Sequence, residues 1–204
     1  PGMCHYQVHI SFSSCISLYV RIMSTSDVAK RKRLHHDMME VVRLLMNPSI
    51  CYHTAIETYF EYIPKPAKLP CGSYCSACDQ TITKSTSLFY PRQLMSLLAT
   101  KGNGDTKVTT KTFMKLLKMN KTTIFHSDHV PKLRTGPFHA LALQLLANGI
   151  IDLKIQDVTK IGIDKLTADH VTLILPNGKD DDGFELAAYM MNQSYNNMTI
   201  VESN

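Results

Sequence analysis

The closely spaced cysteines constrain the fold of this chain more than any other feature. Four of the six cysteines follow the pattern Cys51-x19-Cys71-x3-Cys75-x2-Cys78. A C-x2-C turn brings two sulfurs to one ion, and Cys71, beside a glycine, can supply a third from the same loop. The surrounding loop is rich in Pro, Gly and Ser and has little core, so a bound metal would supply its folding energy. The pattern predicts one structural Zn²⁺ held by Cys51, Cys71, Cys75 and Cys78.

Other interpretations of these cysteines stay open. His53 lies two residues after Cys51 and could replace a cysteine as ligand, or the thiols could be unrelated buried groups or redox-active ones. A catalytic zinc fits less well, because four thiolates leave no coordination position for water. We expect Cys4 and Cys15 to be unliganded. A cluster without a secretory signal suits a metal site in a reducing compartment better than a disulfide framework.

The first half of the chain predicts a strand followed by helices. Residues 14–23 form a short apolar run with β-branched residues, which predicts a buried strand. Ser26 is the expected N-cap of one or two helices over residues 27–46. One face of that segment carries the apolar residues Met38, Val41, Val42 and Leu45. After Asn47-Pro48, a further helix over residues 49–62 is expected to carry Cys51 near its start.

The second half has a different pattern. Leucines at 94, 97 and 98 indicate a first helix, Thr109 or Thr110 is expected to cap a second, and a third is predicted over 136–148 with Gly149 as its stop. Residues 150–155 and 171–175 are predicted to pair as strands. Three helices followed by a hairpin are typical of a winged-helix domain. We therefore expect an α+β, mostly helical chain, in which a small helical zinc-binding subdomain precedes a winged-helix domain.

The charge of the chain indicates its function less strongly than the cysteine pattern does. The net charge of +5 permits an anionic partner without requiring one. The basic run Lys30-Arg31-Lys32-Arg33 is either a solvated helix face or a phosphate contact. His126 and His129 flank Asp128 but have no third ligand nearby, and we find no nucleophile–base pair that predicts an independent enzyme. No stretch approaches the roughly 20 apolar residues of a membrane helix, so no membrane partner is expected.

The residues around the cysteines resemble a known family. Residues 51–61, with Tyr59-Phe60-Glu61, followed by Cys71-Gly72 and Cys75-x2-Cys78-Asp79, resemble the zinc-binding subdomain of RecQ-type DNA helicases. The family's glycine within the Tyr-Phe-Gly-Glu-like motif is absent. The resemblance covers roughly residues 14–175. It implies the end of a helicase lobe over 1–26, the zinc-binding subdomain over 27–80, a linker over 81–92, a winged-helix (RQC-like) domain over 93–176 and a flexible tail over 177–204.

The resemblance implies the DNA-binding C-terminal region of a 3'-5' DNA helicase that acts in repair, recombination or replication. The expected location is the nucleus, or the cytoplasm if the protein is bacterial. ATP and Mg²⁺ would serve only a full-length parent, because the chain has no G-x-x-x-x-G-K-[ST] phosphate loop and no acidic box. Residues 1–13 lack the family's arginines, so we expect a fragment, a degenerate copy or a faulty gene model. The wing has no aromatic tip, which leaves Ile161 or Leu166 as a poorer wedge.

DNA would be held through its phosphates. Free N–H groups and the helix dipole favour anions at helix N-termini, where hydroxyl and basic side chains add contacts. The residues expected to bind DNA, as backbone contacts to a duplex or branched structure, are Lys107, Thr109, Thr110, Lys111, Lys132 and Arg134. Plain helix capping and solvated surface charge are the simpler interpretations of these residues. The alternative function is a zinc-containing winged-helix module that binds protein partners instead of DNA.

Overall fold

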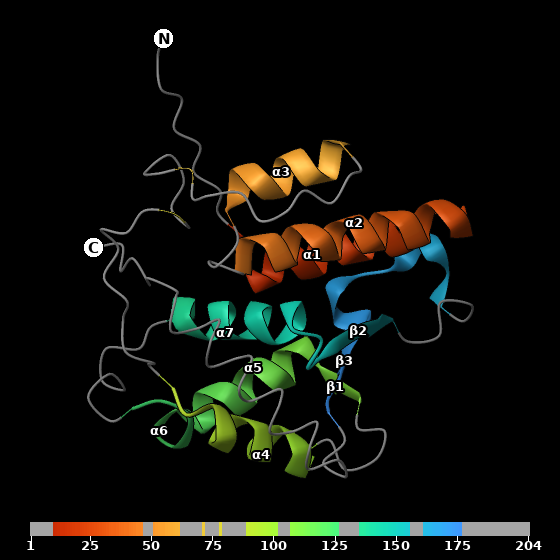
Figure 1. Cartoon of the computed structure of the whole chain (residues 1–204). Coiled ribbons are helices and arrows are strands. Elements are labelled where there is room, and N and C mark those ends of the chain that lie inside the picture. Colours follow the sequence, from red (N-terminus) through yellow and green to blue (C-terminus); the bar gives the residue numbers. More distant parts are fainter. Residues whose placement is uncertain are drawn as a thin grey trace.

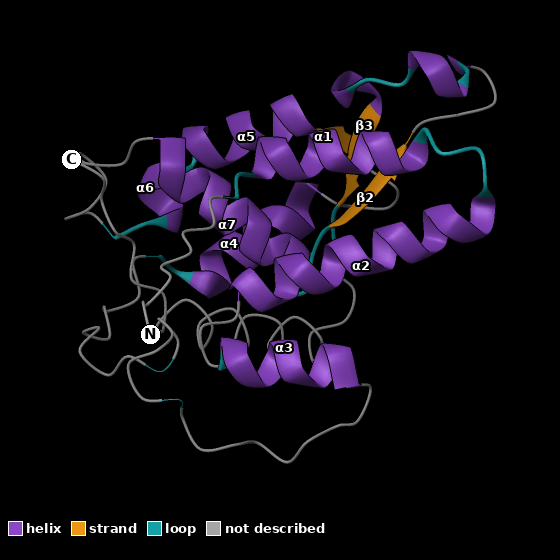
Figure 2. Cartoon of the chain, turned by 90° about the horizontal axis from the view of Figure 1, so that it is seen from above, coloured by secondary structure: helices purple, strands orange, loops and turns teal. Residues whose placement is uncertain are grey.

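The chain folds as a mostly helical structure with one small antiparallel sheet, which confirms the expected α+β class (Figures 1 and 2). The computed structural model describes residues 10–46, 51–61, 71, 78, 89–101, 107–126, 135–155 and 161–176. Its helices are α1 (Phe12–Met23), α2 (Val28–Met46), α3 (Tyr52–Glu61), α4 (Pro91–Lys101), α5 (Thr110–Met119), α6 (Lys121–Ile124) and α7 (Thr135–Ala147). Its strands are β1 (Lys107–Thr109), β2 (Asp152–Ile155) and β3 (Val171–Ile174), with the short 3₁₀ helices η2 (Ile163–Lys165) and η3 (Ala168–His170) between the last two.

Helix α7 lies at the centre of the core. Every residue from Leu141 to Leu146 is buried, because α1 and α2 pack on one side of this helix and α5 packs on the other (Figure 1). The helix ends as predicted at Gly149, whose φ of 68° lies in the left-handed region that favours glycine. The amide of Gly149 donates to the Leu146 carbonyl and that of Ile150 to the Leu145 carbonyl, which closes the helix end in a Schellman motif.

The sheet has the strand order β1-β3-β2, and both pairs are antiparallel. The pairing of β2 with β3, with Leu153 opposite Leu173, confirms the two predicted strands. Strand β1 was not predicted, because three residues are too few to show an alternating pattern. It pairs Val108 with Leu173 and leaves Lys107 and Thr109 exposed immediately before α5.

Helices α4 and α5 begin at residues that favour a helix start. Pro91 occupies the first position of α4, where its missing N–H removes no helical hydrogen bond. Thr109 is the N-cap of α5, as predicted, and its hydroxyl accepts a hydrogen bond from the Thr112 amide at 3.2 Å. The predicted core positions Phe113 and Leu117 are fully buried. Helix α5 therefore presents one apolar face to the core and one polar face to solvent.

The predicted strand over residues 14–23 is wrong: these residues belong to helix α1. The buried positions Phe12, Cys15, Ile16, Tyr19 and Ile22 follow the three-and-four spacing of a helix. A short apolar run does not distinguish a buried strand from a buried helix. The serines between the buried positions are exposed on the opposite side of α1. The segment therefore has one apolar and one polar face, as an amphipathic helix does.

The predicted N-cap of α2 is also wrong by one residue. The Asp27 carboxylate, not Ser26, accepts hydrogen bonds from the amides of Ala29 (2.8 Å) and Lys30 (3.1 Å). Residues 28–46 then form a single helix. Met38 and Val42 are buried as expected, whereas Val41 is 53% exposed.

Helices α1 and α2 share a core with the second half of the chain. Buried side chains from Phe12 to Leu175 form one cluster, and the Tyr19 hydroxyl donates a buried hydrogen bond to the Leu153 carbonyl of β2 at 2.9 Å. The Tyr19 ring also meets His35 of α2 edge-on, with 5.3 Å between ring centroids. These contacts join the first helices to the sheet. The division of the chain into the five predicted segments stays a prediction.

Candidate metal centre and basic surface

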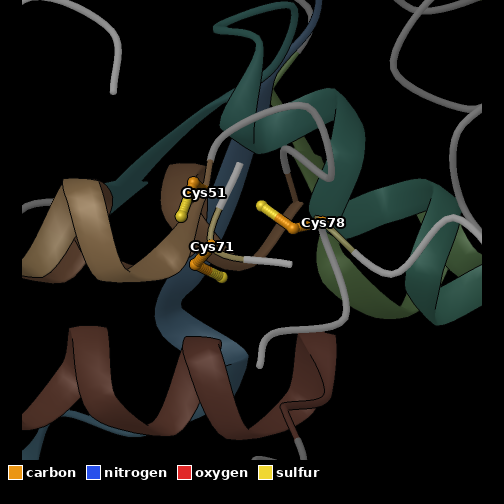
Figure 3. A group of neighbouring side chains, drawn as sticks. All are labelled: Cys51, Cys71 and Cys78. Atoms are coloured by element: carbon orange, nitrogen blue, oxygen red, sulfur yellow. The ribbon is translucent and has the colours of Figure 1, made fainter. Parts of the chain in front are cut away.

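Three of the four predicted ligands lie together at the start of α3. The sulfur atoms of Cys51, Cys71 and Cys78 all lie within 4.8 Å of one another, and each cysteine is half-buried (Figure 3). Cys51 immediately precedes α3, and its carbonyl accepts the first helical hydrogen bond, from the Ala55 amide at 3.0 Å. None of these three cysteines is in a disulfide. The group could therefore hold a metal ion.

The helix start favours the thiolate form of Cys51. Hydrogen bonds from the backbone and hydroxyl of Thr54, with contacts from Cys78 and Cys71, lower the pKa of the Cys51 thiol to about 6, although partial burial opposes the shift. The thiolate is the form that binds metals, and thiols at helix N-termini ionise more readily. Cys51 is consequently the thiolate expected at neutral pH, before any ion adds its own charge.

The other sequence candidates lie elsewhere. Cys75, the fourth predicted ligand, falls outside the described residues, as does Cys4. His53 is exposed on α3 and is not part of the group of three. Cys15 is buried in the core on α1, where burial raises the pKa of its thiol to about 11. Within the described residues, the candidate centre is thus Cys51, Cys71 and Cys78.

The predicted DNA-binding residues of the second half lie at the start of α5. Lys107, Thr109 and Lys111 are exposed and Thr110 is half-buried. The Thr109 hydroxyl, besides capping the helix, lies 2.9 Å from the Thr112 hydroxyl. The capping role assigned to Thr109 is thus observed, and a phosphate would have to compete with Thr112 for the hydroxyl proton. Lys132 and Arg134 fall outside the described residues.

A row of lysines along α5, called here the lysine stripe, was not predicted from the sequence. Lys111, Lys115 and Lys118 recur at helical spacing on the exposed face, opposite the buried Phe113 and Leu117. Residues 107–126 contain five lysines and no acidic residue. Like charges four residues apart repel one another by a few tenths of a kcal/mol, so the stripe opposes helix stability. The i, i+4, i+7 spacing of the lysines is the signal that would have revealed it.

Neither of the two residues suggested as a wedge is exposed in the segment that was predicted to be a wing. Leu166 is 9% exposed, and Ile161 is half-buried against the core. Both side chains therefore stabilise the fold instead of projecting from it, contrary to the suggestion that either might serve as a wedge.

His126 stacks against Tyr90 with ring centroids 4.0 Å apart, while Asp128 and His129 lie outside the described residues.

A comparison of the chain with protein-family models, curated proteins and solved structures found no match. Among the described helices, none combines the length and apolar character needed to cross a membrane. The cysteine group, the fold around α7 and the distribution of charge are consequently the features that indicate a function.

Proposed function

We propose that the chain is a zinc-stabilised DNA-binding region of the RecQ-like type. Four thiolates in a tetrahedron around Zn²⁺, each about 2.3 Å from the ion, lie about 3.8 Å apart. The separations within 4.8 Å among Cys51, Cys71 and Cys78 fit such a centre after a small contraction. Cys75 is the proposed fourth ligand. The ion would have a structural role, tying the loop that contains Cys71 and Cys78 to the start of α3.

The second part of the proposal is a winged-helix domain over residues 93–176. The element order α4, β1, α5, α6, α7, β2, β3 with strand order β1-β3-β2 supports this assignment. Fold does not assign function by itself. The observation that carries DNA binding is the acid-free, lysine-rich surface of α5 and the strand before it.

Lysines on one helix face neutralise phosphates without reading sequence, so they set affinity and salt dependence. Fluorescence anisotropy with duplex DNA tests the proposal. We expect binding that weakens steeply with salt, and a shallower slope for Lys107→Ala/Lys111→Ala than for the parent. Lys101→Ala/Arg21→Ala, which removes the same charge from the ends of α4 and α1, is the matched control. Salt-independent binding, or equal slopes for both double variants, would contradict the proposal.

A protein-binding module is the second candidate, because α3 exposes large apolar side chains. Phe60 is 72% exposed, Tyr59 58% and Ile56 49%. With Val41 of α2 they border a groove of about 950 Å³ that continues to the end of α7. Exposed patches of this kind mark interaction surfaces. Phe60→Ala would then weaken a protein complex while leaving the salt dependence of DNA binding unchanged.

A further inference from the structure

The three cysteines of the candidate centre are also close enough to react with one another. The sulfur atoms of Cys51, Cys71 and Cys78 lie within 4.8 Å of one another, and none of the three is in a disulfide. A disulfide bond joins two sulfurs about 2.05 Å apart. The gap to be closed is therefore less than about 3 Å, and rotation of the side chains about their Cα–Cβ bonds moves the sulfurs.

Figure 3 indicates which pair is oriented for bond formation. Cys51 lies immediately before α3, and Cys71 and Cys78 come from farther along the chain. In this view the Cβ–Sγ bond of Cys78 points toward the Cys51 sulfur, whereas that of Cys71 points away from it (Figure 3). The orientation of the side chains therefore favours a bond between Cys51 and Cys78.

Exposure separates these thiols from the cysteine in the core. Cys51 and Cys78 are half-buried, so a small oxidant reaches them from solvent. Cys15 is 2% exposed and is not part of the group. Cysteines that are oxidised reversibly are accessible and lie beside a second thiol, which resolves the oxidised intermediate. Cys51 and Cys78 meet both conditions, and Cys15 meets neither.

We infer that Cys51 and Cys78 are a site of reversible oxidation, at which hydrogen peroxide forms a disulfide. In the first step the Cys51 sulfur attacks a peroxide oxygen. An S–O bond forms, the O–O bond breaks, and the departing hydroxide takes up a proton to become water. In the second step the Cys78 thiol attacks the Cys51 sulfur, so the S–S bond forms, the S–O bond breaks, and a second water leaves with the thiol proton. The two sulfurs supply the two electrons that reduce one peroxide to two waters.

The disulfide is incompatible with the proposed metal centre. Metals bind the thiolate, and joining Cys51 to Cys78 leaves only Cys71 and the proposed ligand Cys75 of the four thiolates that hold a structural zinc. The covalent bond still links Cys78 to the start of α3, so the tether is kept while the metal is lost. This consequence for zinc rests on the proposed function, whereas the disulfide depends only on the positions of the two sulfurs.

The test treats the purified full chain with hydrogen peroxide and follows three quantities. Absorbance of the zinc complex of 4-(2-pyridylazo)resorcinol measures released zinc, and Ellman's reagent in denaturant counts free thiols. Mass spectrometry without reductant identifies the linked peptides. We expect release of one zinc per chain, a fall from six free thiols to four, and a Cys51–Cys78 link. Dithiothreitol should restore the thiols. Because trypsin leaves Cys71 and Cys78 in one peptide, fragmentation of the linked peptide assigns the bridge.

Variants at single cysteines test the choice of pair. Cys71→Ser should still form the Cys51–Cys78 bond, whereas Cys78→Ser should give little bond from Cys51 to Cys71. Cys15→Ala, outside the group, should behave as the unmutated chain does. Equal yields of a Cys51 link in the two serine variants would overturn the inference.

The unmutated chain provides a test that does not depend on the folding of any variant. If peroxide leaves Cys51 and Cys78 as thiols, or links Cys51 to a different cysteine, the inference is wrong. If the untreated chain holds zinc and no Cys51–Cys78 link forms, the metal centre stands and the inference alone fails. If the untreated chain holds no zinc but the link forms, the inference stands and the proposed metal centre fails.

Discussion

The hydrogen bond from Tyr19 to β2 gives the sharpest stability prediction. Tyr19 is 3% exposed, so water cannot replace its hydroxyl as the donor to the Leu153 carbonyl. Tyr19→Phe keeps the ring against His35 and removes only the hydroxyl. A neutral hydrogen bond contributes about 1 kcal/mol net, and a buried acceptor left without a donor costs about 1–3 kcal/mol. We expect the free energy of unfolding to fall by about 1–2 kcal/mol.

Urea unfolding followed by far-ultraviolet circular dichroism measures this loss. For a chain of this size it corresponds to a midpoint about 0.5–1 M lower with an unchanged slope. Tyr59→Phe is the matched control, because Tyr59 is 58% exposed on α3 and should change the midpoint little. If the two variants unfold at the same urea concentration, the contact does not join α1 to the sheet, and the argument for one shared core is refuted.

Three further predictions concern single sites. Gly149→Ala should lower the free energy of unfolding by about 1–2 kcal/mol in urea, and Gly149→Asn by less, because φ at this position is 68°. The cost comes from the backbone alone, since a new Cβ would meet no atom within 4 Å. Equal stability of the unmutated chain and the alanine variant would refute the left-handed helix end. Iodoacetamide at about pH 8 should label Cys15 only after unfolding, because burial raises the pKa of this thiol to about 11. Mass spectrometry of the peptide that contains Cys15 measures the labelling. Labelling of the folded chain would contradict the position of Cys15 in the core. Burial, and secondarily Lys118, lowers the pKa of His139, so the unfolded chain takes up this proton at higher pH than the folded one. The contribution of neutral His139 to the free energy of unfolding should be fully present above the unfolded pKa of about 6.5 and should be lost as the pH falls below it. His139→Gln should lessen this loss of stability, whereas His36→Gln, at an exposed position of α2, should not. An unchanged loss in the His139 variant would refute the assignment.

The elements with strong local signals could be predicted from the sequence. Gly149 ends α7 and Thr109 begins α5 because backbone conformation and capping depend on a few neighbouring residues. The same holds for β2 and β3, whose apolar residues recur at the spacing of strands. The cysteine spacing likewise predicted a cluster, of which Cys51, Cys71 and Cys78 lie together in the structure.

The remaining features depend on contacts between distant residues. Helix α1 was predicted as a strand because its apolar residues fit either structure until α2 and α7 cover one face. The bond from Tyr19 to Leu153 joins residues 134 positions apart, and no local pattern indicates it. The exposure of Val41 follows from packing in the same way.

The metal content of the purified chain tests the central claim most directly. Inductively coupled plasma mass spectrometry of the parent should find one zinc per chain, and Cys51→Ser and Cys78→Ser should each lose most of it. Cys15→Ala, which removes a thiol outside the group, should retain the metal. Zinc loss should also lower the melting temperature, since the ion supplies folding energy to its loop. No zinc in the parent, or equal zinc in all three variants, would contradict the metal centre and the function built on it.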